Sequence, residues 1–174
     1  MALSNAENIL DILVIGDSNV GKTAMVQQFC DSVLDQPSNL GINLKCRTIV
    51  SKEKKTKLHI WDITGQGRFQ NVAVPYYRKA MGILLIYDIT NVASFNNIVK
   101  WLENIHKLAA SDVRIVLIGN KNDLEDRRVV PRIYGEDLAA RYNLSFIETS
   151  ALENSNIEKI FEDIAEAILN KTQA

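Results

Sequence analysis

A stretch near the amino terminus, residues 16–23, has the sequence GDSNVGKT and matches the phosphate-binding pattern G-x-x-x-x-G-K-[ST]. It follows a short apolar run and opens a helical stretch, which is the context that the pattern requires. The glycines permit a loop whose N–H groups converge on phosphate oxygens at the amino end of a helix. Lys22 would place a positive charge on the terminal phosphates, and Thr23 offers a hydroxyl to Mg²⁺. The predicted phosphate-binding residues here are Ser18, Asn19, Val20, Gly21, Lys22, Thr23 and Ala24.

A second pattern, D-x-x-G-Q, occupies residues 62–66, directly after a strand-like run. Asp62 is placed to hold Mg²⁺ through a water molecule, and Gly65 lets a backbone N–H approach a terminal phosphate. Gln66 is placed to orient an attacking water. The pattern is weak alone, because such residues are also common in turns. Together with the first stretch it predicts catalytic roles for Gln66 and Lys22.

Two further patterns predict a guanine site: NKND at residues 120–123 and ETSAL at 148–152. The Asp123 carboxylate can accept hydrogen bonds from N1–H and the exocyclic amine of guanine, whereas adenine has no donor there. Sites that recognise polar groups in this way can discriminate by about 10⁴ or more. The Lys121 stem can lie along the base, and the N–H of Ala151 can reach guanine O6. The predicted guanine-binding residues are Asn120, Lys121, Asp123, Ser150, Ala151 and Leu152.

The elements that must position these motifs alternate between strands and helices. The expected strands are residues 9–15, 42–50, 56–61, 81–87, 113–118 and 144–147. The expected helices are residues 21–30, a helix capped by Ser94 that runs to Leu108, residues 132–142, and a last helix from Ile157. Residues 31–39 are expected to form a loop, and 65–79 an irregular polar segment. This order predicts an α/β fold: a mainly parallel six-stranded sheet with helices on both faces and ligands at the strands' carboxyl ends.

The composition is that of an ordinary globular domain, with 174 residues, 47% apolar and 24% charged. The formal net charge of −1 gives no reason to expect a nucleic-acid partner. Cys30 and Cys46 form no close-spaced motif, so we expect buried, reduced thiols and a cytoplasmic location. There is no secretory signal, and the longest apolar run, residues 80–87, is too short to span a bilayer. The lysine-rich residues 51–55 are typical of a solvated hairpin tip.

Beyond these motifs, the chain resembles the Ras superfamily over almost its whole length, and the Rab proteins in particular. The Rab-like segments are residues 57–62, 68–69, 76–80, 86–90, 94–97 and 101–102. The resemblance implies a P-loop small G-domain that binds GTP or GDP with Mg²⁺ and switches slowly between two states. It also implies a regulator of vesicle trafficking at the cytosolic face of vesicles or endomembranes. The expected partners are an exchange factor, a GTPase-activating protein and effectors.

The departures from the Rab pattern concentrate in the two switch segments. Asn39 takes the place of the first-switch threonine that ligates Mg²⁺ in Rabs, in a loop that is shorter than the family's, so Asn39 is a candidate metal ligand. Gly67 replaces the usual Glu and loosens the backbone beside Gln66. Small misplacements of an attacking water can cost about 100-fold in rate. The resemblance therefore predicts a slow GTPase. The substitutions at Asn39 and Gly67 are the changes that would impair its hydrolysis rate.

We expect residues 1–174 to form one G domain and a monomer. No cysteine follows Cys46, so the hypervariable, prenylated tail of Rabs is absent from this chain, and membrane attachment is expected only through such a tail outside it. Two alternatives stay open. One is a GTPase-like scaffold that binds nucleotide without cycling, suggested by Asn39 and Gly67. The other is a phosphate-loop kinase or ATPase, against which Asp123 argues.

Overall fold

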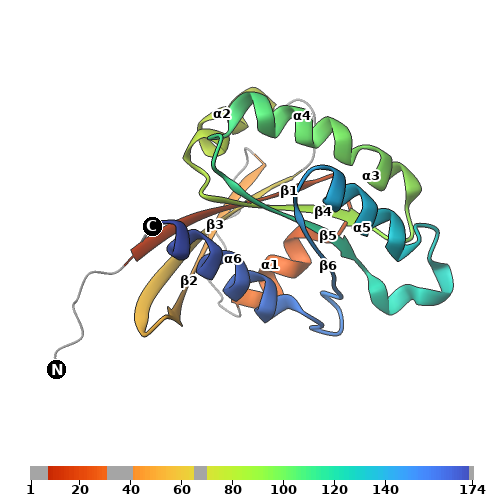
Figure 1. Ribbon diagram of the computed structural model, residues 1–174. Helices are drawn as coiled ribbons and strands as arrows, with labels where there is room; N and C mark the ends of the chain where they lie inside the picture. The colour runs from red at the N-terminus through yellow and green to blue at the C-terminus, as the bar shows by residue number, and fades with distance from the viewer. Residues whose placement is uncertain (1–7, 31–40, 65–69, 173–174) are drawn as a thin grey trace.

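The computed structural model describes residues 8–30, 41–64 and 70–172, which form a six-stranded sheet in the order β2-β3-β1-β4-β5-β6 (Figure 1). Neighbouring strands are parallel except for the antiparallel pair β2 and β3. The strands are β1 (Asn8–Gly16), β2 (Ile42–Ser51), β3 (Lys54–Ile63), β4 (Gly82–Asp88), β5 (Arg114–Asn120) and β6 (Ser145–Glu148). The prediction of a mainly parallel six-stranded α/β sheet is confirmed.

The helices cover both faces of this sheet (Figure 1). They are α1 (Lys22–Cys30), α2 (Gln70–Lys79), α3 (Val92–Asn96), α4 (Ile98–Leu108), α5 (Arg132–Arg141) and α6 (Ile157–Thr172), with a 3-10 helix at Asn122–Arg127. On one face α1 and α6 share a core in which the rings of Phe29 and Phe161 stack, 4.0 Å between centroids. On the other face Ile98, Leu102 and Ile105 of α4 are buried against a second core. Their spacing matches the predicted apolar stripe.

Three local predictions are wrong. Residues 70–79, expected to be irregular, form α2, because burial of Ala73 and Tyr77 on one side of the helix outweighs the unfavourable Pro75. Ser94 does not cap a helix that runs to Leu108. Asn91 is the cap of the short helix α3, and its side-chain oxygen accepts a hydrogen bond of 3.2 Å from the N–H of Ser94. Cys46 is exposed rather than buried, whereas Cys30 is buried.

The two ends of the sheet differ in what they carry. The carboxyl ends of β1, β3, β5 and β6 lead into the four sequence motifs, as expected for an open parallel sheet. At the opposite end β2 turns into β3 through Lys52 and Glu53. The helix α6 runs back from the motif end and finishes at Thr172, so its carboxyl end and the β2–β3 turn lie at the end of the sheet remote from the motifs (Figure 1).

Candidate nucleotide-binding site

The loop between β1 and α1 has the backbone geometry of a phosphate cradle. Asn19 has φ 65°, and Gly21 has φ 100°, both in the left-handed region that L side chains rarely adopt. Gly21 also has no room for a side chain, because a Cβ there would lie 2.3 Å from the amide nitrogen of Asn120. At Gly16 a Cβ would lie 2.2 Å from the carbonyl oxygen of Ile86. These glycines therefore let the loop pack directly against β4 and the third motif.

Lys22 lies inside this loop and is 5% exposed. Its ammonium group donates hydrogen bonds to the carbonyl oxygens of Gly16, at 2.9 Å, and Asp17, at 2.7 Å. Burial lowers the pKa of Lys22 from its ordinary value, an effect that the nearby carboxylates of Asp62 and Asp17 oppose. Phosphate oxygens at this loop would add negative charge beside the buried ammonium and so stabilise its charged form.

Thr23 and Asp62 meet across the site, where they bring together a hydroxyl and a carboxylate, oxygen groups of the kind that a hard cation prefers. The Thr23 hydroxyl donates a hydrogen bond of 2.6 Å to Oδ2 of Asp62. The other carboxylate oxygen, Oδ1, is buried without a hydrogen-bond partner among the described residues. Burial raises the pKa of Asp62, opposed by the bond from Thr23 and the charge of Lys22. A buried oxygen that lacks a partner, beside a hydroxyl, fits Mg²⁺, which prefers oxygen ligands and keeps several waters.

The third motif is tied to the first by Asn120, which is 1% exposed at the end of β5. Its amide nitrogen donates a hydrogen bond of 2.9 Å to the carbonyl oxygen of Val20. Its amide oxygen accepts bonds from the Thr149 hydroxyl, at 2.9 Å, and the Ala151 N–H, at 3.3 Å. Asn120 thereby joins the phosphate loop to both predicted guanine loops, and these predicted site residues do lie together.

Lys121 adopts the left-handed conformation, with φ 68°, and its side chain runs over the phosphate loop. Its ammonium group donates to the carbonyl oxygen of Asn19 at 2.8 Å and pairs with Asp88 at 2.8 Å. These two contacts hold the aliphatic part of the Lys121 side chain extended between the phosphate loop and the third motif, where a planar base can lie against it.

Asp123 accepts a hydrogen bond of 2.7 Å from the hydroxyl of Ser150, which itself accepts a bond from the N–H of Glu153. Only Oδ1 is used in this bond, so the carboxylate keeps acceptor capacity for donors on a base. Leu152 is 83% exposed and contributes no enclosure to the site. Gly65, Gln66 and Asn39 lie outside the described residues.

The sequence alone missed residues that support the site. The Asp17 carboxylate accepts hydrogen bonds from the amide of Asn97, at 2.6 Å, and the indole N–H of Trp101, at 2.9 Å. The phosphate loop is therefore attached to the start of α4. Asp17 occupies a variable position of its motif, and its partners are about eighty residues away, so no local pattern signals the contact.

A buried ion pair between Arg128 and Glu148 connects the two predicted guanine-binding loops. The two terminal guanidinium nitrogens of Arg128, Nη1 and Nη2, donate to the Glu148 carboxylate at 2.7 and 2.9 Å, and the Glu148 side chain is 5% exposed. Hydrogen bonds to Glu148 and then to Glu125 raise the pKa of Arg128. The pair connects the segment after the third motif to the first residue of the fourth. The motif includes Glu148, but no spacing rule points to Arg128.

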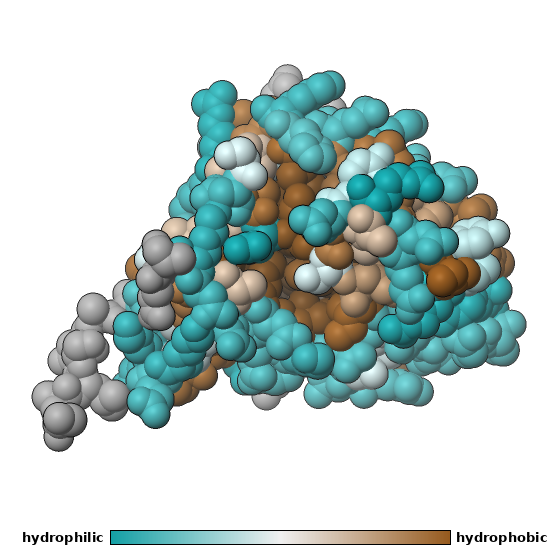
Figure 2. All heavy atoms as spheres, viewed as in Figure 1, coloured by the Kyte–Doolittle hydropathy of each residue, from teal (hydrophilic) through white to brown (hydrophobic). Residues whose placement is uncertain are grey.

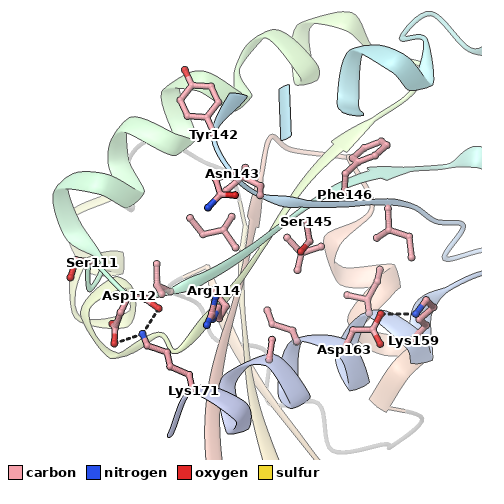
Figure 3. A pocket seen from close by; sticks show the side chains of 18 of the residues that line it. Ser111, Asp112, Arg114, Tyr142, Asn143, Ser145, Phe146, Lys159, Asp163 and Lys171 are labelled. Carbon is pink, nitrogen blue, oxygen red and sulfur yellow. Dashed lines mark hydrogen bonds and ion pairs between the residues drawn. The ribbon is translucent and has the colours of Figure 1, made fainter. Parts of the chain in front are cut away.

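A large hollow lies elsewhere in the described residues. A cavity of 620 Å³ is bordered by Val113, Arg114, Tyr142, Phe146 and Lys171, near the amino ends of β5 and β6 (Figure 3). Figure 2 shows hydrophobic side chains gathered in a hollow on this face of the molecule. The residues of the four motifs do not border it. The polar side chains that converge at the motif end, rather than this hollow, therefore mark the candidate site.

Comparisons with known proteins agree with this geometry. The Ras family model matches residues 11–170 of the chain. The chain is 49% identical over 173 residues to Ras-related protein Rab-10 of Caenorhabditis elegans, covering 98% of this chain and 86% of that protein. It is 46% identical over 165 residues to human Ras-related protein Rab-8B, covering 94% and 80%. Ras-related protein RABE1d of Arabidopsis thaliana is 44% identical over 170 residues, covering 96% and 79%.

Among the described residues, none of the helices combines the length and the apolar character that a membrane span requires.

Proposed function

The chain belongs to the Ras family as a Rab-like small GTPase, a GTP-binding switch in vesicle trafficking, and we propose that the four motifs form its nucleotide site. The observation that carries the proposal is the hydrogen bonding of Asn120 to Val20, Thr149 and Ala151. These bonds fix the guanine loops at one distance and orientation relative to the phosphate loop. A ligand with a base at one end and phosphates at the other fits that arrangement.

In this proposal the phosphates lie on the backbone N–H groups of Ser18, Asn19, Val20, Gly21, Lys22, Thr23 and Ala24. The Lys22 ammonium already lies within the loop, where burial disfavours its charge. Phosphate oxygens would add to the negative charge of Asp62 and Asp17 and offset the effect of burial. As charge develops on the transferred phosphoryl oxygens, the same ammonium stabilises it.

Thr23 and Asp62 would hold Mg²⁺, Thr23 through its hydroxyl and Asp62 through water. The 2.6 Å contact between them and the orphaned Oδ1 of Asp62 support this assignment. When bound, the ion neutralises charge on the β- and γ-phosphates. Asn39 is the third proposed metal ligand, by its match to the switch threonine of Rabs.

Guanine would be recognised by the Asp123 carboxylate, with Lys121 along the base. The Ala151 N–H would donate to O6 in place of its long 3.3 Å contact with Asn120. Ser150 positions Asp123 by its 2.7 Å hydrogen bond. Gln66 would orient the water that attacks the γ-phosphate, with Gly65 giving backbone access to it. Water and GTP yield GDP and phosphate, at an expected intrinsic rate on the order of 10⁻⁴ to 10⁻² per second without a partner.

We further propose that residues 1–174 act as one monomeric domain at the cytosolic face of vesicles or endomembranes. An exchange factor, a GTPase-activating protein and effectors would act on its switch segments. Loss of the γ-phosphate would release those segments, as in other nucleotide switches.

Isothermal titration calorimetry tests the proposed site. Nucleotide-free protein is titrated with GDP and with ATP, in the presence of Mg²⁺. The proposal expects tight GDP binding and ATP binding weaker by about 10⁴ or more. ATP binding as tight as GDP binding would remove Asp123 and Ala151 from the base-recognising role.

A further inference from the structure

The β2–β3 hairpin ends in a basic tip, defined here as residues 50–57. The side chains of Lys52, Lys54 and Lys55 are exposed, and they form no ion pair with any residue in the described ranges. With Lys57 and the single acid Glu53, the tip carries a net charge of +3. Because the whole chain is −1, the remainder carries −4. The molecule is therefore electrically polarised, with its positive end at this tip.

The turn places two charged residues, Lys52 and Glu53, in a backbone conformation that such residues rarely adopt. Lys52 has φ 50° and Glu53 has φ 61°, so the two residues form a tight turn with both in the left-handed region. Asn and Gly are the residues favoured at these positions of a two-residue hairpin turn. A lysine here is an unusual choice for turn geometry, and it projects its charge at the farthest point of the hairpin.

An exposed apolar residue accompanies the lysines. Val50 is 73% exposed and lies opposite Lys55 in the antiparallel pair, so the two side chains share one face. A lysine beside a protruding apolar side chain, with further lysines at the same turn, matches the headgroup region of an anionic bilayer, which takes cations at its surface and apolar groups just beneath.

The position of the tip orients the rest of the molecule. It lies at the same end of the sheet as the carboxyl end of α6 and remote from the nucleotide site (Figure 1). A surface that attracts the tip and repels the negative remainder leaves the nucleotide loops facing away, accessible to partners. A two-residue turn is also too narrow for a stable protein interface, which takes about 800 Å² per partner.

We propose that the tip of the β2–β3 hairpin contacts anionic lipid headgroups through Lys52, Lys54 and Lys55, with Val50 at the headgroup boundary. The contact is independent of any lipid anchor and of the nucleotide site. Its strength is modest, because each lysine near an anionic membrane changes the partition coefficient by about fivefold.

The test measures partition of the GDP-loaded chain onto sedimented vesicles at low ionic strength. One vesicle type is pure phosphatidylcholine, and the other contains about 30% phosphatidylserine, which gives a strong negative surface potential. The test variant combines Lys52→Asn, Lys54→Gln and Lys55→Gln. Asn suits the left-handed position, so the turn is retained. The control combines Lys100→Gln, Lys107→Gln and Lys159→Gln, exposed lysines of α4 and α6. It removes the same charge elsewhere.

The proposal expects binding to phosphatidylserine vesicles alone, a loss of roughly 100-fold in the hairpin variant, and retention in the control. GDP content and melting temperature, measured on every sample, should be equal among the three proteins. Three results would each overturn the proposal: no binding to anionic vesicles, equal binding to neutral ones, or an equal loss in both variants. Hairpin-dependent binding to a polyglutamate peptide without vesicle binding would instead assign the tip to an acidic protein partner.

Discussion

The amide nitrogen of Asn120 donates a hydrogen bond of 2.9 Å to the carbonyl oxygen of Val20, a residue one hundred positions earlier in the chain. This bond connects the loop proposed to bind guanine to the loop proposed to bind phosphate. A Cβ at Gly21 would come within 2.3 Å of the same nitrogen, so the contact also explains why glycine is needed there. The loops proposed to bind the base and the phosphates therefore form one hydrogen-bonded unit.

Replacing Asn120 by alanine should disrupt this unit. The Thr149 hydroxyl and the Ala151 N–H would lose their acceptor in a buried site, at a cost of about 2 kcal/mol or more in the free energy of unfolding. We expect GDP affinity to fall by at least about 10-fold, measured by fluorescence titration. Asn122→Ala is the control, because the described contact of Asn122 with the fourth motif is made by its backbone N–H. Equal effects of the two variants would contradict the role of Asn120.

Asp123→Ala should remove the recognition of guanine. Two hydrogen bonds to a charged acceptor are worth about 3–6 kcal/mol, so GDP affinity should fall by roughly 10² to 10⁴-fold. The unaltered protein should bind GDP more tightly than inosine diphosphate, whose base lacks the exocyclic amine. The variant should bind both equally. A variant that still prefers GDP would show that another group recognises the amine.

The sequence predicts the sheet well and points to the strand ends where the four motifs lie, because both depend on local signals. Buried parallel strands appear as short apolar runs, and each motif carries its own spacing. The sequence does not predict α2 because Pro75 disfavours a helix interior, while the burial of Tyr77 that stabilises the helix depends on tertiary structure. Local propensity is a weak prior that such packing often overrides.

The residues that support the site were beyond sequence reasoning for a different reason. Asp17 meets Trp101, and Arg128 meets Glu148, only after the chain has folded. Asp, Arg and Glu are common on protein surfaces, so nothing in the sequence distinguishes these three charged residues from solvated ones. The departures at Asn39 and Gly67, by contrast, are visible in the sequence but lie outside the described residues.

The ion pair between Arg128 and Glu148 should contribute more to the free energy of unfolding than the longer contact between Arg132 and Glu148. Arg128→Ala leaves a carboxylate that is 5% exposed without its main partner, which typically costs about 3–5 kcal/mol. Arg132→Ala is the matched control, since that side chain is 55% exposed and lies 3.7 Å from the same carboxylate. Its removal should cost about 1 kcal/mol or less. Urea denaturation measures both, and equal midpoints would contradict a structural role for the buried pair.

Mg²⁺ affinity should depend on pH through Asp62. Burial raises the pKa of this carboxyl above 3.8, so as pH falls it takes up a proton at a higher pH than an ordinary Asp. The GDP complex should therefore lose Mg²⁺ affinity before pH 3.8 is reached, as followed by Mg²⁺ titration at a series of pH values. Asp62→Asn should bind Mg²⁺ weakly at every pH. An unchanged affinity of the native protein down to that pH would contradict the assignment.

The raised pKa of Asp62 also affects the folding stability of the nucleotide-free protein, where lower pH is favourable. Because the folded-state pKa of Asp62 is raised, its favourable contribution to stability is complete below pH 3.8 and is lost as pH rises through the raised value. Bound Mg²⁺ and nucleotide offset this loss, so added GDP should raise the melting temperature at neutral pH. A ligand present at about 1,000 times its Kd adds about 4 kcal/mol.

A single-turnover assay tests the GTPase switch most directly. The protein is loaded with GTP and Mg²⁺, freed of excess nucleotide, and the conversion of bound GTP to GDP is followed over time. We predict conversion faster than in the protein-free control, on the order of 10⁻⁴ to 10⁻² per second, and slower still in Gln66→Ala. Protein that demonstrably retains GTP and never converts it would contradict a cycling switch and would favour a nucleotide-binding scaffold.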